Sequence, residues 1–193
     1  MWALLCAGCT QHVTSPGPSA TADADLNERP ANLKSVLFQG ISLPVANQGP
    51  RSQDGAVVSG FDRGPIGAAL AAIQATVRIS VATDSEWAAI GQQMLAPGLG
   101  RDAWAVARAQ ISITAPITGT APLIGGYRIV HYSSTDAEVA IYTTQSDRSI
   151  TCNTAQVIWQ GNDWKLLLPN QPHSAPVTAV PALPADAIAL PLH

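Results

Sequence analysis

The spacing of apolar residues along the chain changes from a helical period to a strand period. From residue 66 onward, apolar positions recur every three to four residues, as they do on one face of a helix. These positions are Ile66, Leu70, Ile73 and Val77. Pro65 suits the first position of this helix, where its missing N–H costs nothing. After Pro122 the spacing falls to two, which is typical of strands.

A second helix is predicted to begin near Trp87. Asp84 precedes it and is predicted to cap its N-terminus, because an aspartate side chain accepts hydrogen bonds from the free N–H groups of a first turn. Ile90 and Met94 share an apolar face with Trp87. Pro97 and the glycine after it end this helix.

A third helix is predicted over residues 100–109. We expect Trp104 and Ala107 to point inward, and Arg101 and Arg108 to point toward solvent. Residues 111–113 are apolar at alternate positions, so the first strand of a sheet is predicted to begin there.

Four strands are predicted after residue 122, over 127–132, 138–144, 150–159 and 164–168. Short polar links join them, and short links require antiparallel pairing. The last link contains Gly161, Asn162 and Asp163, which tolerate the positive φ of a tight hairpin. Residues 36–44 read as one extended segment, followed by a polar loop. The sequence therefore predicts an α+β domain in which N-terminal helices pack on a curved antiparallel sheet of about four strands.

The N-terminus predicts a lipid anchor. Residues 1–9 end in Ala7-Gly8-Cys9, the small-small-Cys pattern at which bacterial lipoprotein signals are cleaved and the cysteine lipidated. The apolar run before Cys9 is short and has no basic start, so we interpret 1–9 as a truncated lipoprotein signal that begins upstream of Met1. The expected location is the extracytoplasmic face of the cell membrane, or secretion as the alternative.

Composition separates the rest of the chain into three parts. Residues 10–35 are rich in Thr, Ser, Pro, Ala and Asp, which predicts a flexible linker. Residues 36–168 hold the single α+β domain. Residues 169–193 form a Pro/Ala-rich tail that is expected to be extended or disordered, or to lie on the domain surface.

Charge and ligand chemistry exclude several function classes. Charged residues make up 12% of the chain and the net charge is −3. No basic stripe is present, so nucleic acid is not expected as a ligand. The four histidines are far apart in sequence, and no nucleotide-binding fingerprint occurs, so neither a metal nor another cofactor is expected. Once the predicted signal is cleaved off, Cys152 is the only cysteine besides Cys9. We expect it to be a small buried apolar residue.

Four side chains are candidates to line a pocket between helix and sheet. Asp62 lies just before the first helix and Asp102 on the third, while Tyr127 and His131 share a predicted strand face with Ile129. An acid, a base or a phenol in a pocket could act in proton transfer. A structural role fits each of them as well: Asp62 can form a loop salt link with Arg63, and a lone histidine is commonly a satisfied structural residue.

The closing hairpin and the first helix carry a family resemblance. The hairpin residues are Val157, Trp159, Asp163, Trp164, Lys165 and Leu166. With the preceding helices they resemble the nuclear-transport-factor-two-like (cystatin-like) superfamily. Residues 60–72 resemble a family of uncharacterised actinobacterial proteins with a Gly-Phe-x-x-Thr-Pro-x-Gly-Ala-x-x-Ala-Ala pattern, often associated with integrative conjugative elements. Here Gly64 replaces the usual threonine. The resemblance covers residues 41–168.

The resemblance implies a function without catalysis. Domains of this fold serve as extracytoplasmic scaffolds in conjugative type IV secretion machines, where the partners are other protein components of a membrane assembly. The expectation is therefore a non-catalytic, membrane-tethered scaffold. The same fold hosts enzymes, so the alternative is a small-molecule-binding or lyase/isomerase-like protein that uses the pocket between helix and sheet.

Overall fold

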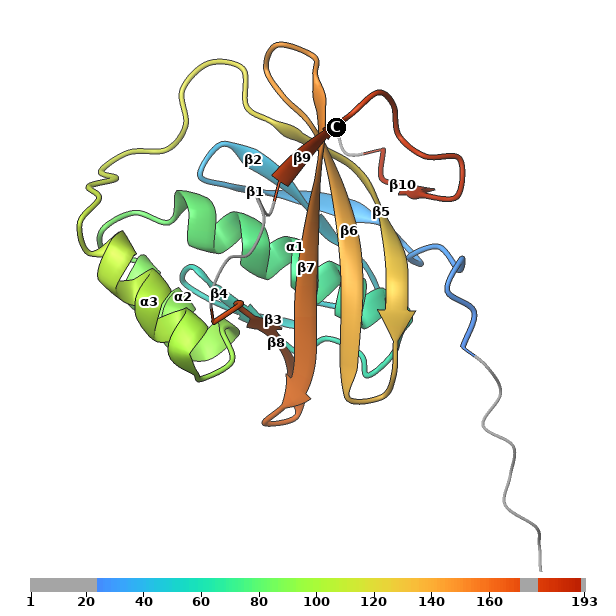
Figure 1. Ribbon diagram of the computed structural model, residues 1–193, viewed down its shortest axis with the longest axis horizontal. Helices are drawn as coiled ribbons and strands as arrows, with labels where there is room; N and C mark the ends of the chain where they lie inside the picture. Colours follow the sequence, from blue (N-terminus) through green and yellow to red (C-terminus); the bar gives the residue numbers. More distant parts are fainter. Residues whose placement is uncertain (1–23, 171–176, 192–193) are drawn as a thin grey trace, which may run out of the picture.

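The computed structural model describes residues 24–170 and 177–191. Within them the chain forms an α+β structure in which three helices separate two sets of strands (Figure 1). The first strands are β1 (Lys34–Phe38), β2 (Ile41–Val45), β3 (Ser52–Asp54) and β4 (Val57–Ser59). The helices are α1 (Pro65–Val81), α2 (Trp87–Met94) and α3 (Leu99–Arg108). The later strands are β5 (Leu123–Tyr132), β6 (Asp136–Thr144), β7 (Ile150–Gln160), β8 (Asp163–Leu167), β9 (Val177–Val180) and β10 (Ile188–Ala189).

The main sheet contains the predicted antiparallel meander. Its strand order is β10-β5-β6-β7-β8, and β9 pairs with β7 beyond the end of β8. All these pairings are antiparallel. The turn between β7 and β8 has Gly161 and Asn162 at φ of 63° each, which confirms the predicted tight hairpin with left-handed residues.

Four short strands precede the helices, so the prediction that the helices come first is wrong. Residues 36–44 do not form one extended segment but fall into two strands of an antiparallel hairpin, with Gln39 and Gly40 at positive φ in its turn. The polar loop that follows contains β3, which pairs with β4. Such strands escape a search for apolar alternation because all three residues of β3 are exposed.

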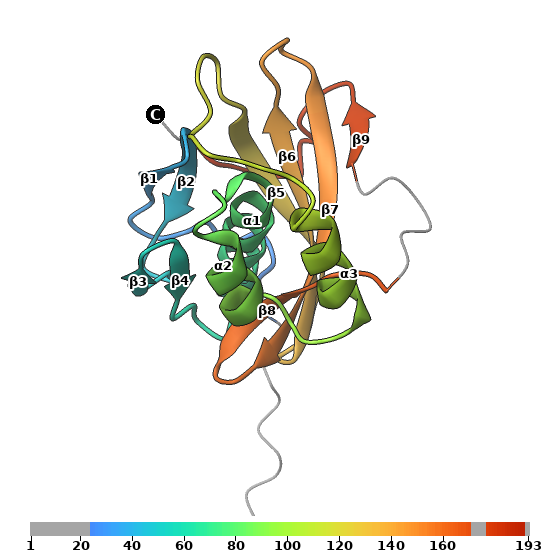
Figure 2. The ribbon, with the colours of Figure 1, turned by 90° about the vertical axis from the view of Figure 1, so that its left-hand side faces the viewer.

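Helix α1 lies at the centre of the molecule, between the main sheet and the two N-terminal hairpins (Figure 2). Its run of small residues explains the position, because alanines let backbones approach closely on several sides. Ala68, Ala69 and Ala72 are fully buried. Gln74 donates to the carbonyl oxygen of Pro44 in β2 (2.8 Å), which joins α1 to the first hairpin.

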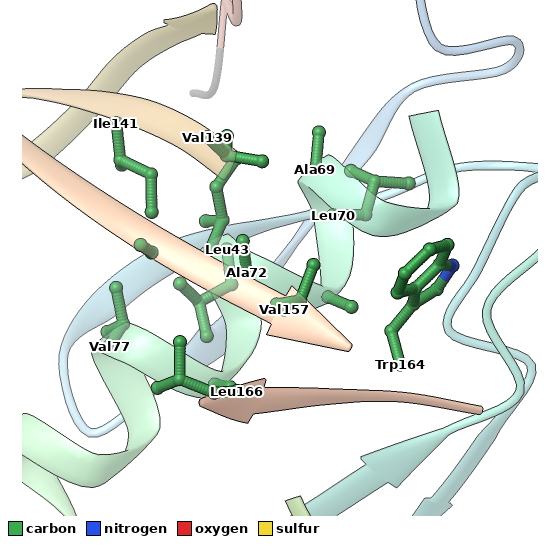
Figure 3. Close-up of a cluster of buried hydrophobic side chains, with 14 of the residues drawn as sticks. Leu43, Ala69, Leu70, Ala72, Val77, Val139, Ile141, Val157, Trp164 and Leu166 are labelled. Carbon is green, nitrogen blue, oxygen red and sulfur yellow. The ribbon is translucent and has the colours of Figure 1, made fainter. Parts of the chain in front are cut away.

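The core lies between α1 and the inner face of the sheet (Figure 3). Leu70 and Ala69 of α1 face Val139 and Val157, which lie on the inner face of the neighbouring strands β6 and β7. Trp164 and Leu166 of β8 close this cluster. Trp159 packs edge to face on Trp164, with ring centroids 5.4 Å apart. All four tryptophans that the structure describes lie in the core or pack against it.

The third helix forms as predicted, but its orientation differs. Arg108 is buried and Ala107 is exposed, which reverses the prediction for both. The guanidinium of Arg108 donates to the carbonyl oxygens of Ala82 and Ile111 and to Asp84. These acceptors compensate the charge, and periodicity alone does not show them. Residues 111–113 form no strand, so that prediction is also wrong.

The C-terminal segment that was predicted as a tail contributes two strands to the sheet. β9 pairs with β7, and β10 pairs with β5 at the opposite edge. The connection between them therefore crosses the sheet, and Asp186 in this connection pairs with Arg128 of β5 at 3.0 Å. Ile188 and Leu190 are buried. Burial of these two apolar side chains explains why a proline-rich stretch is ordered here.

Candidate functional site

A pocket of about 680 Å³ lies between the C-terminal half of α1 and the edge of the sheet. β8 pairs with β7 up to Gln156, and β9 pairs with it only from Asn153. Residues 154 and 155 therefore lie between the two pairings, and the pocket forms beside them. α1 closes the inner side through Thr76, Ile79 and Ser80.

The pocket lining is mainly apolar, with a few polar groups. Its apolar side chains include Ile79, Ala155, Leu166, Leu168 and Val177. The hydroxyl oxygen of Thr76 is buried and has no hydrogen-bond partner among the described residues. Glu138 is the one ionisable side chain among the described lining residues. An apolar cavity with a small number of polar groups is the usual form of a small-molecule site.

The two predicted acids lie away from this pocket and from each other. Asp62 is about half exposed and pairs with Arg51 at 2.5 Å, so the expected link to Arg63 is not formed. The Arg63 guanidinium instead lies over the Trp159 ring and donates to the carbonyl oxygen of Ser134. Asp102 is exposed in the first turn of α3, 3.6 Å from Arg101.

Tyr127 and His131 lie on opposite faces of the sheet, so the prediction that they share a face is wrong. An irregularity in the pairing of β5 with β6 falls between Ile129 and His131, and Val130 is the extra residue. A β-bulge of this kind turns the following side chain to the other face. Tyr127 is fully buried on the inner face, whereas His131 is exposed and 3.2 Å from Asp136.

The hydroxyl of Tyr127 is buried and has no hydrogen-bond partner among the described residues. Burial raises the pKa of this phenol above its ordinary value, so the group stays protonated at neutral pH. Neither Tyr127 nor His131 is among the pocket-lining residues. The four side chains nominated from the sequence therefore lie at four separate places.

Asp84 does not cap the second helix as predicted. It accepts hydrogen bonds from the Ile113 backbone N–H (2.9 Å), the Ser112 hydroxyl (2.7 Å) and Arg108 (3.0 Å). These bonds hold the pKa of Asp84 below its ordinary value, with the backbone bond as the largest cause. The carboxylate fastens the segment after α3 to the start of α2.

Thr83 and Glu86 form a hydrogen-bonded turn before α2, and no side chain caps the helix itself. The Glu86 carboxylate accepts from the Thr83 backbone N–H (2.9 Å) and from its hydroxyl (2.8 Å). Thr83 and Glu86 have the Thr-x-x-Glu spacing of a capping box, but only the half in which the Glu86 carboxylate accepts from the Thr83 N–H is formed.

The remaining buried polar groups are engaged in holding segments together. Arg78 is buried, lies 4.2 Å above the Phe38 ring, and donates to Gln74 and to the carbonyl oxygen of Ala56. Burial lowers the pKa of Arg78 to about 10. The Asp163 carboxylate accepts from the backbone N–H groups of Gly60 and Phe61. These contacts are structural, and none of them faces the pocket.

Residues Thr76 and Glu138 were not singled out for the site by sequence reasoning. Thr76 lies in α1 between the polar residues Gln74 and Arg78, so the sequence offers no distinct signal for it. Glu138 is half-buried. Pairing of Glu138 with Gln156 explains its nearness to the pocket.

Over residues 24–170 and 177–191, no three His, Cys, Asp or Glu side chains come close enough to hold a metal ion. None of the described helices is both long and apolar enough to cross a membrane. Cys9, His12, His173 and His193 lie outside the described residues. Cys152 is a free, partly buried cysteine.

Comparison with known proteins assigns the chain to a family. Neither the curated proteins nor the solved structures contain a significant match. A family model described as a domain of unknown function (DUF8175) matches residues 8–185. This match includes the helices, the meander and β9, so the chain belongs to the DUF8175 family.

Proposed function

We propose that this protein is a non-catalytic scaffold domain, tethered to the cell membrane by a lipid on Cys9 and located on the extracytoplasmic side. Its partners are other protein components of a membrane assembly. The assembly that we propose is a conjugative transfer apparatus of the type IV secretion kind.

The observation that carries this proposal is the separation of the possible catalytic groups. Proton transfer requires an acid or base within hydrogen-bond reach of one substrate position. Asp62 and His131 are engaged with Arg51 and Asp136, whereas Asp102 is exposed on α3. The four nominated side chains converge on no common point, which is the arrangement expected of a binding domain.

An exposed apolar surface on α3 supports a role in protein contacts. Leu99 is 69% exposed and Val106 is 65% exposed, and they lie seven residues apart, which is two turns of the helix. Ala103 lies between them and is exposed as well. Exposed apolar side chains that line up on one helix face are typical of protein interaction sites.

The finer fold assignment is part of the proposal. We assign the domain to the nuclear-transport-factor-two-like (cystatin-like) group, because helices cover one face of an antiparallel sheet that a Trp-rich hairpin closes (Figure 2). The structure departs from the expected four-strand arrangement at both ends, where the N-terminal hairpins and β9 with β10 are added.

A complementation experiment tests the scaffold proposal. A donor strain that lacks the gene is complemented with the full upstream reading frame, and transfer frequency is measured. A quadruple variant is expected to restore transfer. It combines Asp62→Asn, Asp102→Asn, Tyr127→Phe and His131→Gln. Cys9→Ser, which removes the lipid attachment, is expected to fail. If the quadruple variant is folded and present at the wild-type level but does not restore transfer, the result would instead indicate catalysis.

Small-molecule binding or a lyase/isomerase-like activity is the second candidate. The pocket of about 680 Å³ between α1 and the sheet favours binding. It lies where the sequence predicts a helix–sheet pocket, but different residues line it.

A further inference from the structure

The hairpin of β3 and β4 exposes an aspartate that is followed by a glycine. We infer that Asp54 is a site of spontaneous isoaspartate formation in the folded protein, with the backbone nitrogen of Gly55 as the nucleophile. Both residues are exposed, and they lie where β3 ends and the turn to β4 begins. The inference concerns a covalent modification of the chain, so it goes beyond the scaffold proposal and does not depend on it.

The reaction needs no reactant other than water. The Gly55 nitrogen attacks the Cγ atom of the Asp54 carboxyl group, a C–N bond forms, and the carboxyl hydroxyl leaves as water with the amide proton. The product is a five-membered succinimide ring. Water then opens the ring, and opening at the main-chain carbonyl carbon leaves the chain running through the Asp54 side chain. One water is lost and one is gained, and no group is oxidised or reduced.

The nitrogen of Gly55 is accessible for this attack. A side chain on the residue after the aspartate would screen the nitrogen, and glycine has none. A Cβ atom added to Gly55 would meet no atom within 4 Å, so the space around the residue is open. Its N–H makes no hydrogen bond within the described part of the chain. No bond therefore has to break before this nitrogen reacts.

The carboxyl group of Asp54 is not engaged elsewhere. Among residues 24–170 and 177–191 it has no hydrogen-bond or ion-pair partner. Asp84 provides the contrast, because it also precedes a small residue, Ser85. The Asp84 carboxylate accepts three hydrogen bonds and is thereby held away from the next backbone nitrogen. Asp54 should therefore react in preference to Asp84.

Strand β3 can release Asp54 while the rest of the domain stays folded. Ring closure requires rotation about ψ of Asp54, which opens the end of the hairpin. All three residues of β3 are exposed, and β3 forms a two-stranded sheet with β4. Such a sheet is marginally stable by itself, so its end opens locally at a small free-energy cost. The Gln53 amide bonds the Gly55 carbonyl oxygen at 3.1 Å, but this bond is exposed to water.

The modification at Asp54 would reach the core through Ala56. The carbonyl oxygen of Ala56 accepts a hydrogen bond from the buried guanidinium of Arg78 at 2.7 Å. An isoaspartate adds one carbon atom to the main chain shortly before this carbonyl group. The turn is too short to keep both the pairing of β3 with β4 and the bond to Arg78. We expect the unfolding midpoint of the modified protein to fall by about 5 °C.

Ageing of the folded full chain tests the site. The protein is kept in mildly acidic buffer made with heavy-oxygen water, well below its unfolding midpoint, and is then digested in ordinary water. Peptide mass spectrometry locates the heavy oxygen, and an isoaspartyl methyltransferase labels the isoaspartate. We expect the peptide with Asp54 to gain one heavy oxygen and to carry most of the methyl label. Equal labelling of Asp54 and Asp84, or labelling of Asp54 only after denaturation, would overturn the inference.

Asp54→Glu is the matched variant for the link to Arg78. It keeps the carboxylate but lengthens the side chain by one carbon, so the five-membered ring cannot form. Before ageing, the variant should unfold at the wild-type temperature. After ageing, its label at this position and its fall in midpoint should both be lost, whereas Asp102→Glu on α3 should behave as wild type. An equal fall in midpoint in aged Asp54→Glu would refute the proposed effect on the core.

Discussion

Asp163 is hydrogen-bonded to the backbone of Phe61, which lies 102 residues earlier in the chain (3.1 Å). The other carboxylate oxygen accepts from the Gly60 N–H at 3.0 Å. The indole N–H of the adjacent Trp164 donates to the carbonyl oxygen of Asp62 (2.9 Å). The β7–β8 hairpin is thereby fastened to the segment that leads into α1, and the central helix is held at its N-terminus.

Asp163→Ala should therefore destabilise the protein strongly. The change removes the acceptor of three backbone N–H groups, those of Gly60, Phe61 and Trp164, and two of these bonds are buried. We expect a loss of about 3 kcal/mol in the free energy of unfolding, measured by urea denaturation. Asp147→Ala is the control, because Asp147 bonds only to nearby Ser149 in an exposed turn. Equal losses in both variants would contradict the role given to Asp163.

Arg78 provides a second test of the core. Its guanidinium bonds Gln74 and the Ala56 carbonyl oxygen while it lies over the Phe38 ring. Arg78→Ala should cost about 3 kcal/mol, because it removes packing and leaves buried acceptors unpaired. Arg101→Ala, on the surface of α3, should cost less than about 0.5 kcal/mol. A small loss in Arg78→Ala would show that this buried cation adds little to stability.

Acid should weaken the protein through Asp84. Hydrogen bonds from the Ile113 N–H, from Ser112 and from Arg108 lower the pKa of this carboxyl in the folded state. A lowered folded-state pKa gives stability that is present above the unfolded pKa of about 3.9 and is lost as the pH falls through the folded pKa. Asp84→Asn should flatten the dependence of unfolding free energy on pH between about pH 5 and pH 2. Asp54→Asn, on exposed β3, is the comparison. A pH profile identical to wild type in Asp84→Asn would contradict this assignment.

The C-terminal strand β10 should contribute to stability. Ile188 is 6% exposed and Leu190 is 4% exposed. Removal of either side chain to alanine leaves a cavity, and the expected loss in unfolding free energy is about 2–4 kcal/mol. Val177→Ala is the control, since Val177 of β9 is 47% exposed. If truncation before residue 181 left the unfolding midpoint unchanged, β10 would not belong to the stable domain.

The parts of the fold that the sequence predicts are those with strong local signals. α1 has a long apolar period with Pro65 at its start, and the β7–β8 hairpin has Gly161 and Asn162 in its turn. Both depend mainly on neighbouring residues. β3 and β10 have no such signal, because their pairing partners Val57–Ser59 and Gly126–Tyr127 determine them.

The candidate site was harder to predict than the fold. One inserted residue, Val130, moves His131 to the outer face, and alternation along the strand cannot reveal it. The burial of Arg108 depends on carbonyl oxygens from other segments. The pocket itself arises where β8 ends and β9 begins, which is a property of the sheet and not of any one segment.

The attachment of the domain to the membrane is the central claim, and one measurement tests it most directly. The protein is expressed in its host from the full upstream reading frame, and its intact mass and membrane fractionation are determined. The account predicts a diacylglyceryl increment on Cys9 and recovery in the membrane fraction, both lost in Cys9→Ser. An unmodified protein that begins at Met1 and remains in the cytosol would contradict it.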